Sequence, residues 1–182
     1  PKVPEPKRYA WLGPRAGHDL AFQAGIGGGL LPGVYGGGSF GWGIRPAHAW
    51  PIWLSATGFW PQSASDQRGR FSALYGGISV CPLTGARGRI SAQVCPSFSA
   101  GALWAEGRKL LTTKDRSLAQ AFVGLELRGD LRIAGPLSLA LTGRLDVPLI
   151  RQNFTYRRPG GDTSPAESVT IHRVAPVTLA LL

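Results

Sequence analysis

The longest stretch without a charged side chain, residues 20–44, sets the first limit on how this chain can fold. Its 25 residues are enough to cross a bilayer as a helix, which needs about 20. It contains ten glycines and a Pro32-Gly33 break at its centre. An interior glycine lowers helix propensity by roughly 1 kcal/mol and a proline by about 3, so a helix is excluded. A flexible linker is excluded too, because linkers are polar and this stretch carries Phe22, Phe40 and Trp42.

Alternate positions of this stretch carry different kinds of side chain. Before the break, one set is apolar, namely Leu20, Phe22, Ala24 and Ile26. After the break, large apolar residues recur with the same spacing, at Val34, Phe40, Trp42 and Ile44. Most of the positions between them are small or weakly polar. A period of two is typical of extended chain with two unlike faces, and two such runs around a turn predict a β-hairpin.

The composition of the chain favours one folded domain. The 182 residues include 26 glycines and 15 prolines, and charged residues make up only 16% of them. Disordered chains are polar and rich in charge, so we expect this chain to fold. No other uninterrupted apolar run reaches about 18 residues, and the sequence therefore predicts no transmembrane helix.

The N-terminal residues 1–17 are rich in proline, which suits an extended, semi-rigid tether. We expect this start to result from cutting or processing that removed the targeting information. The formal net charge of the whole chain is +10. This charge serves either general solubility or attraction to an anionic surface, such as lipid head groups or nucleic acid.

The period of two recurs in eight segments along the chain. They are residues 20–26, 34–44, 52–60, 74–80, 90–100, 121–133, 137–149 and 169–181. The connections after the second, fourth and sixth segments are compact, at 46–51, 82–88 and 134–136. Those after the third, fifth and seventh are longer and polar, at 62–69, 107–117 and 152–168, whereas the first, at 31–33, is short. Alternating short and long connections are expected when one end of a barrel faces the periplasm.

With these segments and connections, the chain resembles the small outer-membrane β-barrels of the OmpA/OmpX-like class. The resemblance runs from about residue 19 to residue 182. It implies an all-β fold, an eight-stranded antiparallel up-and-down transmembrane β-barrel, in the outer membrane of a Gram-negative bacterium. We assign the barrel to residues 18–182 and the Pro-rich N-terminal tether to 1–17. The tether would offer an attachment for a periplasmic partner or an upstream domain.

Charged residues in the middle of two segments bear on which face meets lipid. They alternate with leucine and valine, and we expect them to form an ion-pair network in the lumen, namely Glu126, Arg128, Asp130, Arg132, Arg144 and Asp146. A turn at 134–136 places Glu126 opposite Arg144, which we predict to be the central pair. A lone buried charge costs several kcal/mol, so charges inside must pair. The alternatives are that these charges face bulk water, or that the chain is a soluble lipocalin-like ligand-binding barrel with the opposite polarity.

The aromatic residues and the cysteines fit the same barrel. Trp42, Trp50 and Trp53 lie near one group of connections, and Trp60 and Trp104 near the other. Belts of tryptophan are expected at both edges of a spanning barrel. Cys81 and Cys95 occur in two Val-Cys-Pro contexts on inward positions of adjacent strands, and an oxidising periplasm favours a disulfide between them.

Other motifs give weaker signals. The GxGxxG match at 36–41 lacks the following helix that a dinucleotide site needs, and we expect no cofactor or metal site. The long connections carry basic residues that suit the phosphates of lipopolysaccharide, namely Arg108, Lys109, Lys114, Arg116, Arg157 and Arg158. We expect no nucleic-acid partner, because few aromatic residues are interleaved with these charges. Ser168, Thr170 and His172 lie close together, but such proximity is a poor basis for catalysis, and we expect no catalytic residues.

The sequence therefore predicts a structural, anchoring or surface-binding outer-membrane barrel. Side chains fill the lumen of an eight-stranded barrel, so we expect no wide pore. An enzyme that modifies lipid or lipopolysaccharide from the barrel wall is the alternative function, and outer-membrane lipid and lipopolysaccharide are the expected partners.

Overall fold

A computed structural model shows eleven strands in the part of the chain that it describes. It describes residues 17–47, 49–63, 69–107, 116–150, 153–158 and 167–182. Among these residues no helix is long and apolar enough to cross a membrane.

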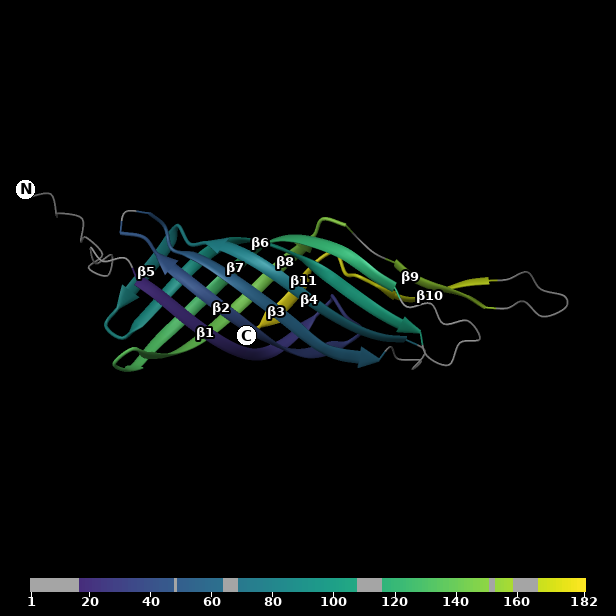
Figure 1. Ribbon diagram of the computed structural model, residues 1–182, viewed down its shortest axis with the longest axis horizontal. Helices are drawn as coiled ribbons and strands as arrows, with labels where there is room; N and C mark the ends of the chain where they lie inside the picture. Colours follow the sequence, from purple (N-terminus) through teal and green to yellow (C-terminus); the bar gives the residue numbers. More distant parts are fainter. Residues whose placement is uncertain (1–16, 48, 64–68, 108–115, 151–152, 159–166) are drawn as a thin grey trace, which may run out of the picture.

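Eight of the strands form a closed wall in which neighbours are antiparallel. The first four are β1 (Gly17–Gly28), β2 (Val34–Arg45), β3 (Ile52–Ser63) and β4 (Gly69–Val80). The other four are β6 (Ile90–Gly107), β7 (Arg116–Ala134), β8 (Leu137–Pro148) and β11 (Thr178–Leu181). Each pairs with the next, and β11 closes the wall by pairing with both β8 and β1. Figure 1 shows these strands tilted across the long axis of the barrel. The predicted eight-stranded antiparallel up-and-down barrel is confirmed.

The structure differs from two of the predicted segment boundaries at prolines. After the fourth segment, residues 74–80, the chain continues past Pro82 as the short strand β5 (Leu83–Arg87), which also pairs with β6. A proline has no N–H for the ladder, and at this break the N–H of Cys81 donates to the carbonyl oxygen of Pro51 at 2.9 Å. Residues 82–88, predicted as a compact connection, are therefore mostly strand.

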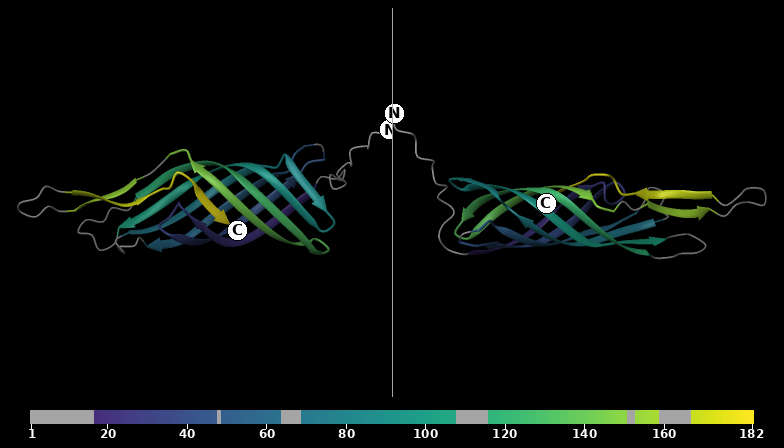
Figure 2. Two further views of the ribbon diagram at one scale, coloured as in Figure 1. Left: turned by 180° about the vertical axis from the view of Figure 1, so that it is seen from behind. Right: turned by 90° about the horizontal axis from the view of Figure 1, so that it is seen from above.

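The eighth predicted segment, residues 169–181, is divided. Its first part belongs to β10 (Glu167–Arg173), which pairs with β9 (Asn153–Arg158) in a separate two-stranded sheet. This hairpin extends beyond one end of the barrel (Figure 1). Pro176 lies in the break before β11, where the N–H of Ala175 donates to the carbonyl oxygen of Gly29 at 2.8 Å. Figure 2 shows β11 ending part-way along the wall.

The glycines of β2 make room for aromatic rings of β3. Pairing of β2 with β1 aligns Leu20 with Trp42 and Phe22 with Phe40 on the outer face, as the period of two predicts. On the inner face, a Cβ atom at Gly43 would lie 2.7 Å from the Trp53 ring, and one at Gly37 would lie 2.6 Å from the Phe59 ring. The glycine-rich composition of this hairpin therefore follows from the space that a narrow lumen must leave for large side chains.

The interior divides into zones along the barrel axis. Large apolar and aromatic side chains fill the end from which the β9–β10 hairpin extends, and they include Leu31, Tyr35, Phe71, Tyr75, Leu103 and Phe122. Toward the other end, a smaller cluster joins Ala21, Trp53, Cys81 and Cys95. Polar side chains occupy the length between these two clusters.

Candidate functional site

The outer surface of the barrel is apolar around the wall. Every barrel strand contributes exposed large apolar side chains, among them Leu20, Phe22, Phe40, Trp42, Leu54, Trp60, Leu74, Ile78, Phe98, Trp104, Leu125, Leu127, Leu141, Leu145, Leu179 and Leu181. Their exposed fractions range from 39% at Trp42 to 80% at Phe22. Soluble monomers rarely expose contiguous apolar patches of more than a few hundred Å², so this surface requires an apolar environment or a partner.

The middle of the lumen is lined by small polar side chains that hydrogen-bond between strands. The hydroxyl of Thr57 on β3 donates to that of Ser39 on β2 at 3.1 Å. The side-chain amide of Gln23 on β1 donates to the hydroxyl of Thr142 on β8 at 2.7 Å. These bonds satisfy buried polar groups that would otherwise lose their hydration.

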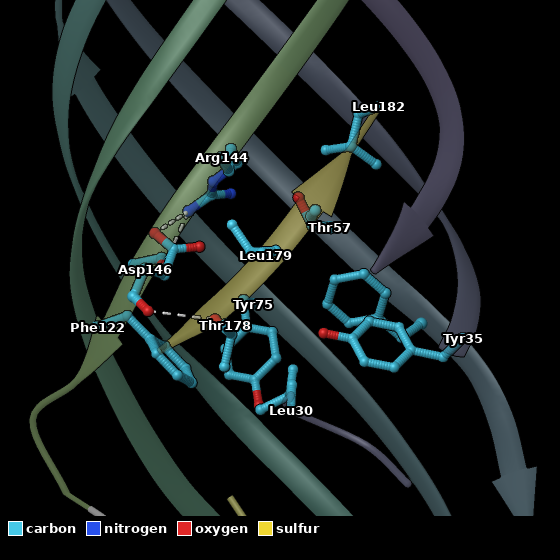
Figure 3. A pocket seen from close by; sticks show the side chains of 13 residues that line it. Leu30, Tyr35, Thr57, Tyr75, Phe122, Arg144, Asp146, Thr178, Leu179 and Leu182 are labelled. Atoms are coloured by element: carbon cyan, nitrogen blue, oxygen red, sulfur yellow. Dashed lines mark hydrogen bonds and ion pairs between the residues drawn. The ribbon is translucent and has the colours of Figure 1, made fainter. Parts of the chain in front are cut away.

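Two arginines in this polar zone pair with aspartates on their own strands. Nε of Arg128 lies 3.2 Å from a carboxylate oxygen of Asp130, and Nη2 of Arg144 lies 3.3 Å from one of Asp146. Residues two apart on a strand share a face, which is why each pair can form locally. Arg144 also donates to the hydroxyl of Ser99 on β6 at 3.3 Å. Figure 3 shows the Arg144–Asp146 pair beside the aromatic zone.

The network differs from the predicted one at its centre. Glu126 is buried and lies opposite Arg144 in the β7–β8 register, as predicted. The ion pairs within 4.0 Å among the described residues do not include Glu126 with Arg144. The hydroxyl of Ser79 hydrogen-bonds Glu126, while Arg144 and Arg128 attract its charge from farther away. The prediction of a Glu126–Arg144 ion pair is therefore wrong. Arg128 and Arg144 each bind the aspartate two residues farther along their own strand instead.

Arg132 is a second correction to the predicted network. Its side chain is exposed, and it takes part in none of the ion pairs of the described residues. Its position near the last residue of β7 explains this, because the strand leaves the enclosed part of the lumen there. Four of the six predicted residues therefore form the two local pairs, and Glu126 lies between them.

Trp53 was predicted to belong to an aromatic belt, and this prediction is wrong. Its side chain is buried in the lumen. Its ring lies under the guanidinium carbon of Arg128, 3.6 Å from the ring centroid. Its Nε1–H donates to Oε1 of Gln93 on β6 at 3.3 Å. The period of two places Trp53 on the opposite face from Leu54, which is exposed. The other tryptophans proposed for the belts, Trp42, Trp50, Trp60 and Trp104, are exposed.

The two cysteines are joined inside the barrel. The Sγ atoms of Cys81 and Cys95 are bonded at 2.04 Å, and both residues are fully buried. The bond links the residue after β4 to Cys95 in the first half of β6. It therefore holds the two strands together at the point where Pro82 interrupts the ladder.

Small cavities remain in the lumen. One, of about 30 Å³, lies between the aromatic zone and the Arg144–Asp146 pair (Figure 3). Another, of about 20 Å³, is lined by polar side chains that include Glu126 and Arg128. A cavity needs roughly 10–15 Å³ on this measure to hold one water, so these spaces suit single waters and not a larger ligand.

A pair at the mouth of the barrel was not predicted. Nη2 of Arg45 on β2 lies 2.9 Å from a carboxylate oxygen of Asp19 on β1. The signal was present in the sequence, since these residues flank the uncharged stretch on its two sides. A hairpin with arms of equal length brings them together.

Several predicted residues are only partly covered by the structure. Residues 1–16 of the tether lie outside the described residues, and so do the basic residues Arg108, Lys109 and Lys114. Arg116 lies at the start of β7, and Arg157 and Arg158 lie on β9, with their backbones alone described. Ser168, Thr170 and His172 lie on β10, in register with β9. Their roles remain predictions.

Together these features define the class of the protein as a closed eight-stranded antiparallel β-barrel with an apolar exterior and a filled interior. Comparisons of the chain with protein-family models, with curated proteins and with solved structures found no match.

Proposed function

We propose that this chain is an outer-membrane β-barrel of a Gram-negative bacterium, similar to the OmpA/OmpX-like class. The observation that carries the proposal is the exterior, where apolar side chains such as Leu125, Leu127 and Leu141 are exposed around the wall. A bilayer supplies the apolar environment that this surface requires. Internal pairing of backbone groups is a condition for crossing hydrocarbon with strands, and β11 supplies it to β1 at residues 26–28 and to β8 at residues 143–146.

The dimensions of the strands support the same proposal. A tilted strand crosses a bilayer with about 9–11 residues. Seven of the eight wall strands reach this length, since β1, β2, β3, β4 and β8 have 12 residues each, β6 has 18 and β7 has 19, whereas β11 has four. The polarity favours lipid over a soluble lipocalin-like barrel, since Arg128, Arg144 and Glu126 face inward and leucines face outward.

We assign the barrel an anchoring or surface-binding role and no wide pore. The aromatic zone, the buried Trp53 and the two arginine–aspartate pairs fill the lumen. The β9–β10 hairpin extends beyond the barrel and carries Arg157 and Arg158 on β9. With Arg108, Lys109, Lys114 and Arg116, these residues are proposed contacts for the anionic groups of lipopolysaccharide.

The experiment separates a membrane barrel from a soluble one and from a channel. The chain is expressed with a secretion signal in a Gram-negative host, and the membranes are fractionated. We expect it in the outer-membrane fraction, with faster migration before boiling than after on a denaturing gel. In planar bilayers we expect no conductance of porin size. Recovery in the soluble fraction without detergent would reject the membrane proposal, and large stepwise conductance would reject the filled lumen.

A further inference from the structure

Three arginines gather at the end of the barrel where short turns join the strands. Arg87 is the last residue of β5, Arg89 lies in the turn before β6, and Arg132 lies near the end of β7. The N–H of Arg132 donates to the carbonyl oxygen of Arg89 at 2.8 Å, so the turn residue Arg89 lies beside Arg132 of β7. Arg87 pairs in register with Ile90, directly after the turn. All three side chains are exposed, and we call this group the arginine rim.

The three arginines of the rim form no ion pair within 4.0 Å in the described part of the chain. The ion pairs found there belong to other arginines, namely Arg45, Arg128 and Arg144. Asp130, two residues before Arg132, is already bound by Arg128 at 3.2 Å. The rim therefore offers three guanidinium groups to a partner in solution or in a membrane.

One member of the arginine rim, Arg87, lies in a row with the apolar exterior, while Arg89 and Arg132 each adjoin a residue of that row along the chain. Arg87 pairs with Ile90, Ile90 pairs with Leu131, and Leu131 pairs with Leu139. Residues that pair across strands have side chains on the same face of the sheet, so these four form one row on the outer face. Ile90, Leu131 and Leu139 are all exposed. A molecule bound here meets a positive charge and a hydrocarbon-like surface side by side.

We propose that the arginine rim binds the phosphate of an anionic glycerophospholipid whose acyl chains lie along Ile90, Leu131 and Leu139. The guanidinium group matches the geometry of phosphate oxygens. The apolar stem of arginine also lets the charge reach the head-group level while its carbons stay in hydrocarbon. A nucleic acid would use the charge and leave the apolar row without a role. The inference rests on the proposed function and adds a lipid preference at one end of the barrel.

The test places the full chain in nanodiscs that contain phosphatidylcholine and phosphatidylglycerol in equal amounts. Native mass spectrometry then counts the lipids that stay bound to the released protein. We expect phosphatidylglycerol to be enriched among them. Each arginine near an anionic surface contributes about 1 kcal/mol, or roughly fivefold. The triple variant Arg87→Gln, Arg89→Gln and Arg132→Gln should therefore lower the enrichment by at least about tenfold.

The matched control is Arg173→Gln, an exposed arginine on β10 toward the opposite end of the barrel, and it should keep the enrichment. Heat-modifiable migration checks the folding of each variant. If the triple variant does not fold, the enrichment of phosphatidylglycerol is measured for Arg89→Gln alone and for the unaltered chain at rising salt concentrations. Both changes should lower it. Equal retention of the two lipids by the unaltered chain overturns this inference and leaves the proposed function in place. Failure to enter discs of either lipid overturns the proposed function itself.

Discussion

Each of the two arginines in the lumen forms an ion pair with an aspartate that lies two residues farther along the same strand. Arg144 is nearly enclosed, bridges Asp146 on β8 and Ser99 on β6, and lines cavities on both sides of it. Arg128 is held by Asp130 and by the ring of Trp53. The polar zone is therefore built from local charge pairs that side chains from other strands support.

Replacing Arg144 with methionine should destabilise the barrel strongly. The change leaves the partly buried Asp146 without its partner, and breaking a fully buried pair from one side costs about 3–5 kcal/mol, which is the upper limit here. Arg132→Met is the matched control on an exposed arginine, with an expected change within about 0.5 kcal/mol. Urea unfolding in neutral-detergent micelles, followed by tryptophan fluorescence, measures both. Equal effects of the two substitutions would show that the Arg144–Asp146 pair does not hold the lumen together.

The sequence predicted which residues face the lumen better than which of them pair. The period of two placed Glu126, Arg128, Arg144 and Asp146 inside, and the turn at 134–136 gave the correct register of Glu126 with Arg144. The choice of partner could not be read from that register. An arginine side chain is long enough to reach the next inward residue of its own strand, and this local geometry decides the pairing.

At the scale of strands, the β2–β3 pair shows how glycine and aromatic residues complement each other. Gly37 and Gly43 of β2 lie beneath Phe59 and Trp53 of β3. Phe59 in turn contacts the ring of Tyr35, with centroids 4.8 Å apart. The apolar alternation made the strands predictable. The packing of rings over glycines depends on the curvature of a small barrel, which a single strand does not encode.

Gly43→Val should therefore destabilise the barrel through a clash with Trp53. Overpacking of this kind costs typically about 1–3 kcal/mol. Gly143→Val in β8 is the control, because a Cβ atom there meets nothing within 4 Å. Adding Trp53→Ala to Gly43→Val should recover part of the loss, and a double-mutant cycle measures the coupling. Additive effects of the two changes would contradict the proposed packing.

The ends of the strands were less predictable than their existence. Pro82 and Pro176 mark the two interruptions, and proline is confined to strand edges, strand starts and bulges. The alternating pattern continues across Pro176, so periodicity alone joined β10 and β11, which the structure separates. At Pro82 the error was the opposite one, because residues 82–88 were predicted as a connection and contain the strand β5. The backbone bonds of Cys81 with Pro51 and of Ala175 with Gly29 come from residues far away in the sequence.

For the whole molecule, the proposed function places hydrocarbon against the outside of the wall. An arginine on that face should then be unfavourable in proportion to its depth. Leu127→Arg, in the middle part of β7, should cost about 2–4 kcal/mol in a bilayer, against about 0–1 for Ile133→Arg near the rim. Reversible unfolding from phosphatidylcholine vesicles measures both values. A soluble barrel would tolerate the two changes equally, since both side chains would enter water.

The most direct test follows a nitroxide spin label along β7 in vesicles. Single cysteines replace residues 123 to 128 in turn, with the Cys81–Cys95 bond left intact. The account predicts that labels at Val123, Leu125 and Leu127 collide with oxygen and not with a water-soluble nickel chelate, whereas the alternating inward sites collide little with either. Frequent collisions of the nickel chelate with labels at Leu125 and Leu127 would show that this face meets water and would contradict the account.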